Sequence, residues 1–505
     1  MGKEQSHIIV NRNFVKGEID KRIYGSFVEH MGRVVYTGIY EPSHETADED
    51  GFRGDVLDKV KEMGVTAVRY PGGNFVSCYD WRDGVGPVEN RPRRLEIAWR
   101  AIETNEVGTN EFMKWARKAG IEPVFAVNLG TKGIENAVSL VEYCNIEGGT
   151  YYSDLRKENG VEIPYGIKTW CLGNEMDGDW QIGHKTAQEY GRIAQETAKA
   201  MKQVDADIKV VSCGSSKSDM KTYPDWEAET LKYTYPYVDY ISLHQYYGGQ
   251  EMGTESFLSQ SLDMEDYIKT VIGTCDYVKA WHRSDKTIYI SFDEWGVWSV
   301  PDKEVAASVD ASPWQVAPHL SEQIYTMEDA LLFAGMMMNF LKYADRIKIA
   351  CQSLLTNISA AIMTKEEGEV WVQPIYYPFM HMANYGSGKV LQGVDEIPAY
   401  DCALRKQVPY VDYVVVHNEE KKEVVLFAVN RMEGEMAEIT LELQGFEAVR
   451  VIEHVTMHSL DKKATNLENH ERVKPEQSDT SSLAQGVLTS RLPALSWNMV
   501  RIAIL

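Results

Sequence analysis

The sequence predicts an α/β protein, a (β/α)8 barrel followed by an all-β sandwich domain. Eight short apolar segments with strand character alternate with segments of helical periodicity over about the first 385 residues. After Tyr385–Gly388 the helical periodicity stops and strand-like segments follow one another. Strands that alternate with helices are parallel and joined by crossovers, and eight such units close into a barrel.

The eight candidate strands are short, apolar and rich in β-branched or aromatic residues, as is typical of buried parallel strands. A doubly wound open sheet is the alternative, but no GxGxxG or GxxxxGKS/T motif follows an early strand to support nucleotide binding. The candidate strands are Ile23–His30, Val65–Asn74, Glu122–Gly130, Lys168–Glu175, Asp207–Ser216, Val238–Tyr247, Thr287–Gly296 and Ile347–Ile358.

Helices are predicted between these strands where apolar residues recur every three or four positions. Val56, Leu57, Val60 and Met63 form one such face, and a second predicted helix ends at Gly120, a typical C-terminal stop. This second helix covers Phe112–Ala119, and two more are predicted over Ala187–Met201 and about Glu322–Tyr343.

The C-terminal part predicts an all-β domain, because its strand-like segments are separated by Gly-, Asn-, Asp- and Lys-rich turns. Ser459–Gln485 is polar and predicts a long surface loop. The strand-like segments are Tyr410–His417, Glu423–Asn430, Ala437–Leu443, Val449–Val455 and Met499–Leu505.

The first strand-like segment, His7–Val10, precedes the barrel. We expect it to pair with the C-terminal sheet, because chain ends are often held in this way. The predicted division of the chain is therefore an N-terminal strand segment in 1–20, a catalytic barrel in 21–385 and a β-sandwich in 386–505.

Composition narrows the class of partner. The 505 residues carry a formal charge of -23, which argues against nucleic acid and anionic membranes and suits a neutral substrate. The seven cysteines are scattered without a CxxC pair, so neither a disulfide framework nor a zinc site is predicted. Met1–His7 lacks the apolar core and cleavage site of a secretory signal, and we expect a cytoplasmic protein.

Two of the predicted strands end in a glutamate, Glu175 in Gly173–Gly178 and Glu294 in Ser291–Gly296. A carboxylate at the lip of a buried strand is costly unless it is paired or used. Two such carboxylates predict a paired-carboxylate site of the kind that glycoside hydrolysis requires, in which one is kept protonated and the other ionised.

Polar residues also end most of the other predicted strands, and the active site of a barrel lies at this end of its strands. Taken alone, each of these residues could serve the structure only. Glu29 and Arg69, for example, could simply form an ion pair. Together they predict a site formed by Glu29, His30, Arg69, Asn74, Asn128, Asn174, His244, Gln245, Tyr246, Asp293, Gln352 and Asn357.

Side chains near the two glutamates suggest how they are held. Tyr246 is expected to donate a hydrogen bond to the carboxylate of Glu294. Four tryptophans fall in or near loops at the predicted barrel mouth, where aromatic faces suit the apolar faces of sugars. They are Trp99, Trp180, Trp295 and Trp298.

Four of these motifs occur in order along the chain: Arg69–Asn74, Gly173–Gly178, Leu243–Tyr247 and Asp293–Trp295. They resemble the signatures of glycoside hydrolase family 51, the α-L-arabinofuranosidases. The resemblance runs from Tyr24–His30 to Leu492–Ser496 and so covers nearly the whole chain.

The resemblance implies a (β/α)8 barrel with a jelly-roll-like sandwich, Glu175 as acid/base and Glu294 as nucleophile. It also implies that Trp99 and Trp298 border the leaving-group side, and that the protein is intracellular and forms a homohexamer. No metal or cofactor is predicted. The residues implied to hold the arabinofuranose ring or orient the nucleophile are Glu29, Arg69, Asn74, Asn174, Tyr246 and Gln352.

We therefore predict a retaining, exo-acting α-L-arabinofuranosidase that acts on oligosaccharides derived from arabinan or arabinoxylan. A β-xylosidase or endo-β-glucanase on the same site is the first alternative. A metal-dependent sugar isomerase would need ligands such as His30, His244 and His319. A non-catalytic sugar-binding protein, with the sandwich as its binding module, is the third.

Overall fold

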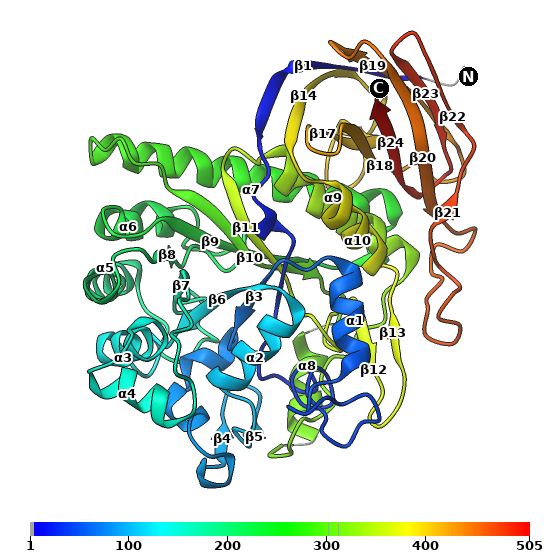
Figure 1. Cartoon of the computed structure of the whole chain (residues 1–505). Helices are drawn as coiled ribbons and strands as arrows, with labels where there is room; N and C mark the ends of the chain where they lie inside the picture. Colours follow the sequence, from blue (N-terminus) through cyan, green and yellow to red (C-terminus); the bar gives the residue numbers. More distant parts are fainter. Residues whose placement is uncertain (1–4, 301, 312) are drawn as a thin grey trace.

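The computed structural model describes residues 5–300, 302–311 and 313–505. It consists of a closed barrel of parallel strands and a large sheet that lies beside one end of the barrel (Figure 1). Among the described residues, no helix combines the length and the apolar character needed to cross a membrane.

The eight predicted barrel strands are confirmed, and each is shorter than the apolar segment that predicted it. Their order around the barrel is β10-β11-β2-β3-β6-β7-β8-β9. The polar residues that follow several of the strands leave the ladder and form loops. The strands are β2 (Gly25–Phe27), β3 (Ala67–Tyr70), β6 (Glu122–Val127), β7 (Thr169–Leu172), β8 (Lys209–Ser212), β9 (Tyr240–Tyr247), β10 (Tyr289–Val297) and β11 (Ile347–Gln352).

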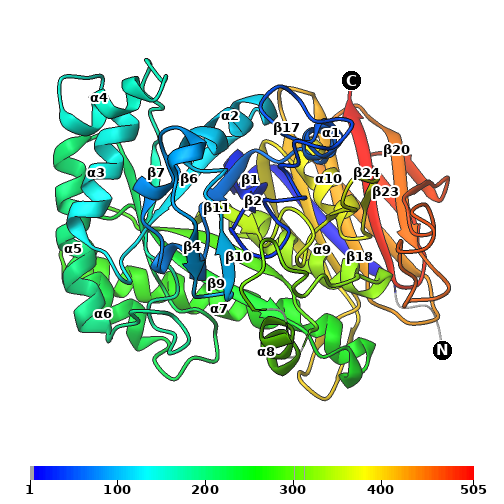
Figure 2. The ribbon, with the colours of Figure 1, turned by 90° about the horizontal axis from the view of Figure 1, so that it is seen from below.

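Helices surround the barrel (Figure 2). α1 ends at Gly64, whose φ of 81° is the left-handed conformation that favours glycine, and α5 begins at Thr186, whose hydroxyl accepts the backbone N–H of Glu189. The helices are α1 (Gly54–Met63), α2 (Thr109–Ala119), α3 (Ile134–Asn145), α4 (Tyr151–Glu158), α5 (Ala187–Val204), α6 (Asp225–Thr234), α7 (Thr254–Trp281), α8 (Asp302–Ala311), α9 (Met327–Lys342) and α10 (Tyr376–Tyr385).

The loops at the carboxyl ends of the barrel strands form the mouth. They carry the hairpin of β4 (Arg94–Glu96) and β5 (Ala101–Glu103), which lies with α8 at the lower end of the molecule in Figure 1. The β4–β5 hairpin is joined to the segment that follows α8, because the backbone N–H of Trp314 donates to the carbonyl of Arg100 at 2.6 Å.

The second part is one ten-stranded sheet that curls on itself, in the order β21-β20-β24-β18-β17-β14-β1-β19-β23-β22. β1 lies inside this sheet, antiparallel to β14 and parallel to β19. The strands are β1 (Ser6–Glu18), β14 (Lys389–Glu396), β17 (Val411–Asn418), β18 (Glu423–Asn430), β19 (Ala437–Gln444), β20 (Val449–His458), β21 (Glu476–Gln477), β22 (Ser481–Ala484), β23 (Val487–Leu492) and β24 (Ser496–Ile504).

The predicted loop Ser459–Gln485 is partly wrong, because it contains β21 and β22. Both are short strands at the two edges of the sheet and have no buried residue, so they carry little apolar pattern. Besides the β4–β5 hairpin, two more two-stranded sheets of the described residues lie outside the barrel and the ten-stranded sheet. They are formed by β12 (Ile362–Thr364) with β13 (Val370–Val372) and by β15 (Ala399–Tyr400) with β16 (Val408–Pro409).

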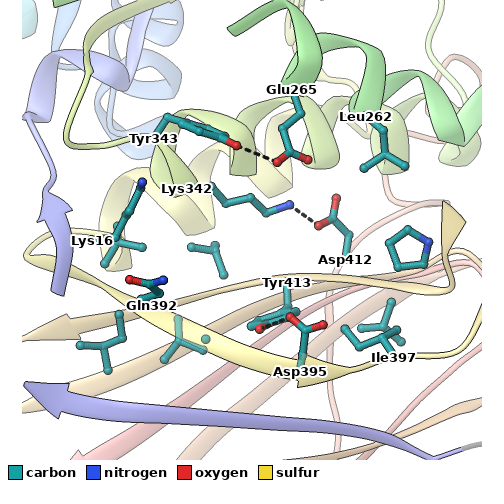
Figure 3. Close-up of a pocket in the computed structure, with 17 residues that line it drawn as sticks. Lys16, Leu262, Glu265, Lys342, Tyr343, Gln392, Asp395, Ile397, Asp412 and Tyr413 are labelled. Atoms are coloured by element: carbon teal, nitrogen blue, oxygen red, sulfur yellow. Dashed lines mark hydrogen bonds and ion pairs between the residues drawn. The ribbon is translucent and has the colours of Figure 1, made fainter. Parts of the chain in front are cut away.

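A groove of about 440 Å³ separates the barrel helices from the sheet (Figure 3). At its floor the buried carboxylate of Asp412, on β17, pairs with Lys342 of α9 and, at 2.6 Å, with Arg431. Tyr413 donates to Asp395 at 2.8 Å on the sheet side of the groove. Asp412 therefore links the two parts of the molecule through buried charge.

Candidate active site

Glu175 and Glu294 come from opposite sides of the barrel and meet at its mouth. Glu175 follows β7, Glu294 lies within β10, and two strands separate them around the barrel. One carboxylate oxygen from each lies within 4.8 Å of the other. Retaining glycosidases hold their two carboxyl groups about 5–5.5 Å apart, whereas inverting enzymes need about 6.5–9.5 Å. The spacing here matches the retaining class.

The loop after β7 places Glu175. Gly173 has a φ of 85° and Glu175 itself a φ of 45°, a left-handed conformation that is uncommon for a residue with a side chain. The backbone N–H of Gly178 donates to the carbonyl of Glu175 at 3.0 Å and closes the turn. Strained backbone of this kind occurs at functional sites where the surrounding structure holds it.

A bulge in β10 places Glu294. The register of β10 against β9 shifts between Ser291 and Glu294. Asp293 and Glu294 are consecutive and both are buried, with 0% and 6% exposure, because β10 is covered on both faces, as is typical of a parallel barrel strand.

His244, on β9, joins the two glutamates. Its Nδ1 lies 3.0 Å from Oε1 of Glu175 and 2.7 Å from Oε2 of Glu294, and its Nε2 lies 3.0 Å from Oδ1 of Asp293. Burial alone would lower the pKa of His244, but the charge of Glu294 and the hydrogen bonds to Asp293 and Glu175 outweigh it and raise the pKa well above its usual value. These contacts therefore favour the imidazolium form of His244.

The two carboxyl groups titrate together. Burial raises the pKa of Glu294, and the charge of Glu175 adds to this more than His244 and Arg69 can offset. Burial also acts on Glu175, but the hydrogen bond and charge of His244, with the bond from Trp180 and the charge of Arg69, outweigh it and lower the pKa.

Arg69 and Asn174 form one wall of the site. Nη2 of Arg69 donates to Oδ1 of Asn174 at 2.8 Å, and Nη1 lies 3.8 Å from Oε1 of Glu294. Asn174 in turn donates to Oδ1 of Asn74 at 3.4 Å. Arg69 is 1% exposed, and its Nε and Nη1 have no hydrogen-bond partner among the described residues.

Glu29 lies beside this wall. Its Oε1 accepts the backbone N–H of Phe75 at 2.9 Å and the indole N–H of Trp99 at 3.0 Å. Burial, with the charge of Glu294, raises the pKa of Glu29 to about 7. A methyl group built on Gly73 would lie 2.9 Å from Oε1 of Glu294 and 3.2 Å from Oε2 of Glu29. Gly73 therefore lies between these two acids.

The remaining predicted binding residues border the site in different ways. The expected hydrogen bond from Tyr246 to Glu294 does not form; the hydroxyl donates instead to Oγ of Ser353 at 2.8 Å. Gln352 is fully buried, and its Oε1 has no partner among the described residues. Trp298 packs edge-on against Tyr246, with the ring centroids 5.7 Å apart.

The four tryptophans separate into two groups. The expectation for Trp295 was wrong: it is fully buried and packs on Phe333 and Phe340 of α9, so it is a core residue. Trp180, by contrast, is 45% exposed and donates its indole N–H to Oε2 of Glu175 at 2.7 Å.

Glu175, His244 and Glu294 are also close enough to hold a metal ion, since their ligand atoms all lie within 4.8 Å of one another. The other two histidines that a metal site would need lie elsewhere. His30 contacts Glu103 at 2.9 Å, and His319 is exposed and contacts Glu322. The three histidines do not converge.

Sequence reasoning placed His244 and Asp293 at strand ends but did not predict that they bridge the glutamates. It also did not predict the contact of Trp180 with Glu175. All three depend on contacts between distant segments. A signal for His244 was present, however, because it ends a predicted barrel strand and histidine is the side chain that most often transfers protons in active sites.

Two family profiles match the chain. Residues 59–280 match the α-L-arabinofuranosidase 1 domain, and residues 293–496 match the α-L-arabinofuranosidase C-terminal domain. Together they span most of the barrel and most of the curled sheet.

Full-length relatives give the same result. The chain is 54% identical to an intracellular exo-α-(1→5)-L-arabinofuranosidase 1 of Bacillus subtilis and 53% identical to an intracellular exo-α-(1→5)-L-arabinofuranosidase of Acetivibrio thermocellus, with 99% of each chain covered in both cases. A solved family 51 α-L-arabinofuranosidase from Bifidobacterium longum superposes with a TM-score of 0.94 at 41% identity, over 99% of this chain and 100% of that one. This chain belongs to glycoside hydrolase family 51, the α-L-arabinofuranosidases.

Proposed function

We propose that this protein is a retaining, exo-acting α-L-arabinofuranosidase that releases terminal arabinofuranosyl residues from oligosaccharides derived from arabinan or arabinoxylan. One observation carries the proposal: in a family 51 chain, Glu175 and Glu294 face each other with carboxylate oxygens within 4.8 Å. An inverting mechanism needs room for a water molecule between one carboxylate and the sugar, and this separation leaves none.

The reaction has two steps. In the first, Glu294 attacks the anomeric carbon while Glu175 gives its proton to the leaving oxygen, so that the glycosidic bond breaks and a covalent ester to Glu294 forms. In the second, Glu175 takes a proton from water, the water oxygen bonds to the anomeric carbon, and the ester to Glu294 breaks. Two inversions restore the original configuration.

The roles require Glu175 to be protonated and Glu294 ionised when the sugar is bound. In the free protein the pKa of Glu175 is lowered and that of Glu294 is raised. Nδ1 of His244 lies within 3.0 Å of both carboxylates, so a proton can move between Glu175 and Glu294 through the imidazole without passing through solvent. A sugar whose hydroxyls donate to Glu294 would favour its ionised form, and the proton would then move to Glu175.

Side chains with unused hydrogen-bonding capacity support a sugar site between the glutamates. Arg69 offers free N–H groups, Gln352 a free carbonyl oxygen, and Glu29 a buried carboxyl group. Asn74, Asn174 and Tyr246 complete the proposed ring-binding set, and Trp99 and Trp298 the leaving-group side.

The setting of the enzyme is part of the proposal. A cytoplasmic location is supported by the relatives, which are named as intracellular enzymes, and their names also favour α-(1→5)-linked substrates. A homohexamer is proposed from the family resemblance. Light scattering on the purified protein, whose chain mass is 57.3 kDa, gives the oligomeric state directly.

The test of the two roles uses Glu175→Ala and Glu294→Ala with a dinitrophenyl arabinofuranoside, whose leaving group needs no protonation. Glu175→Ala should form the glycosyl-enzyme but hydrolyse it slowly, and azide should restore turnover as a glycosyl azide of retained configuration. Glu294→Ala should be inactive, and azide should rescue it only with inversion. Proton NMR of the products reads the configuration, and the opposite pattern would show that the roles are reversed.

The same assay on a nitrophenyl β-xyloside separates the nearest alternative. Initial rates on the arabinofuranoside should exceed those on the xyloside by more than about tenfold, or roughly 1.4 kcal/mol in transition-state stabilisation. Full activity in EDTA is also expected, because the proposed chemistry uses only the two carboxylates.

A further inference from the structure

Glu96, the last residue of β4, is a buried acid that the two-step chemistry does not use. It is 5% exposed. Its Oε1 accepts the backbone N–H of Ala98 at 2.8 Å, and its Oε2 accepts the backbone N–H of Trp99 at 2.7 Å. Burial of a carboxyl group is costly unless hydrogen bonds compensate for it. Here both oxygens hold the turn that carries Trp99.

The β4–β5 hairpin needs such a hold, because apolar packing does little to fix it. Leu95 is 62% exposed and Ile97 is 47% exposed. A pocket of about 300 Å³ lies against the hairpin, and both Glu96 and Glu103 line it. A two-stranded hairpin is only marginally stable by itself. The polar contacts of Glu96 therefore determine where the turn lies.

Trp99 connects this turn to the proposed sugar site. Its indole N–H donates to Oε1 of Glu29 at 3.0 Å, and the same oxygen accepts the backbone N–H of Phe75 at 2.9 Å. Trp99 is thus bonded to Glu96 through its backbone and to Glu29 through its ring. The two contacts act in series, because a shift of the turn also moves the indole N–H that reaches Glu29.

We propose that Glu96 is a positioning residue for the sugar site. Its carboxylate fixes the backbone of Trp99, and Trp99 in turn fixes the orientation of the Glu29 carboxyl group. Glu96 acts only through these two residues and does not contact the sugar. The proposal rests on the place given to Glu29 in the proposed function.

The hold on the turn depends on the charge of Glu96. An ionised carboxylate accepts strong hydrogen bonds on both oxygens, whereas a protonated carboxyl group carries a proton on one of them. Burial raises the pKa of Glu96 to about 8, against the bonds from Trp99 and Ala98, and the charges of Glu29 and Glu103 add to the rise. The hold therefore strengthens as the pH rises through this value.

Other ionisable groups face the same region. Burial, with the charge of Glu294, raises the pKa of Glu29 to about 7, so Glu29 is also ionised above the pKa of Glu96. Burial and the charge of Glu96 raise the pKa of the Cys78 thiol to about 11. Glu103 is paired with His30 at 2.9 Å. The remaining ion pairs that line the pocket are Asp80–Lys132 and Asp83–Arg94.

The experiment is a double-mutant cycle between Glu96 and Trp99. Glu96→Gln keeps the size of the side chain but replaces one acceptor oxygen with an amide NH2 group. Trp99→Phe keeps an aromatic ring but loses the donor to Glu29. Values of kcat and KM are measured for the parent, both single variants and the double variant at about pH 6 and about pH 9. The substrate is the dinitrophenyl arabinofuranoside, whose departure needs little proton transfer at either pH.

The matched control is Asp48→Asn. Oδ1 of Asp48 also accepts two backbone N–H groups, from Asp50 at 2.9 Å and from Phe52 at 3.0 Å, and its other oxygen pairs with Lys118 of α2. This variant removes the charge of an acid that holds a turn without a bond to Trp99. It should keep the kcat/KM of the parent at both pH values.

At about pH 9, Glu96→Gln and Trp99→Phe should each lose about tenfold in kcat/KM, and the double variant should lose little more than either one. The loss should appear in kcat as well as in KM, because the proposed bond from Glu29 to the sugar tightens in the transition state. At about pH 6 the loss in Glu96→Gln should fall below about threefold, because the parent side chain is then protonated.

Independent losses that multiply in the double variant, or full kcat/KM of Glu96→Gln at the higher pH, would overturn the proposal and leave the proposed function intact. An equal loss at both pH values would also overturn it, since a packing role alone has no such dependence. Failure of the proposed function is a different result, because the parent enzyme would then not hydrolyse the arabinofuranoside.

Thermal unfolding of each variant, compared with the parent, shows whether the measured enzyme is folded. If Glu96→Gln does not fold, Glu96→Asp takes its place in the cycle, because it keeps the charge and shortens the side chain by one methylene. It should show the same coupling to Trp99→Phe at the higher pH, and independent losses would overturn the proposal in this case as well.

Discussion

The Nε2 atom of His244 lies 3.0 Å from Oδ1 of the fully buried Asp293, and this contact turns the other ring nitrogen toward the two glutamates. Asp293 is therefore the anchor of the catalytic cluster, although it touches neither of the proposed catalytic oxygens. Its own pKa is lowered, because Arg69 and His244 outweigh the effect of burial.

Asp293→Asn should move the acidic limb of kcat, which reports the substrate complex, to higher pH. Without the carboxylate, the pKa of His244 falls, and less positive charge remains near Glu294 at neutral pH. The pKa of Glu294 then rises further, and more alkaline conditions are needed to ionise the nucleophile. The pH profile with a nitrophenyl arabinofuranoside measures the shift. Asp276→Asn, at an exposed ion pair with Arg346, should leave it unchanged.

Glu29→Ala should lower kcat as well as raise KM, with a loss in kcat/KM of about tenfold or more, or roughly 1.4 kcal/mol. The carboxyl group of Glu29 lies beside Glu294 around Gly73, where it would bind a ring hydroxyl whose hydrogen bond tightens in the transition state. Steady-state kinetics on the arabinofuranoside measure both constants. A loss of less than about threefold would remove Glu29 from the site.

Gly73→Ala should reduce kcat/KM on the order of 10²-fold, the effect of a misplacement of about 1 Å at a reacting group. The new methyl group would lie 2.9 Å from Oε1 of Glu294, and that carboxylate would have to move. Gly273→Ala in α7 is the control, since a methyl group there would meet nothing within 4 Å beyond the backbone of its own helix. It should keep full activity and gain about 0.4–1 kcal/mol of stability.

Asp412→Asn should lower the free energy of unfolding by about 3–5 kcal/mol, because it leaves Lys342 and Arg431 without their buried counter-charge. Activity at low temperature should be kept, since none of these residues contacts the site. Urea denaturation measures the loss. Asp395→Asn, whose exposed carboxylate accepts only from Tyr413 among the described residues, is the control in the same groove.

The pH dependence of this loss follows from the sign of the shift. Burial would raise the pKa of Asp412, but the charges of Lys342 and Arg431 outweigh it and lower the pKa below its usual 3.8. Such a group stabilises the fold above its unfolded pKa, and the contribution disappears as the pH falls through the folded pKa. The stability difference between parent and variant should therefore shrink below about pH 4.

The barrel strands and the two lip glutamates were predictable because the signal is local. Each strand is a short apolar run, and the residue that follows it is polar. The long helix α7 was not predicted, because Ser256, Ser259 and Ser261 occupy buried positions on its inner face and blur the apolar period. Tertiary packing, together with nearby carbonyl groups that accept from the hydroxyls of Ser259 and Ser261, is what makes those positions buried.

The chemistry within the site was less predictable than its position. Which oxygen Tyr246 approaches depends on how β9 and β11 lie relative to each other, and the sequence carries no measure of that. In the sheet, β14 was not predicted, since only Val390 and Leu391 of its residues are buried. It is recognised as a strand only through its partners.

The place of β1 in the sheet has a consequence for how the chain assembles. Ile8 pairs with Asp395 and with Leu441. β1 is therefore synthesised first but can pair only after β14 and β19 have been synthesised, late in the chain. Contacts of such long sequence separation form slowly, and until they form the edges of β14 and β19 stay open to other chains. If the C-terminal segment were expressed alone, the place of β1 between β14 and β19 would stay empty. A peptide covering Ser6–Glu18, added in trans, is the natural means to fill it.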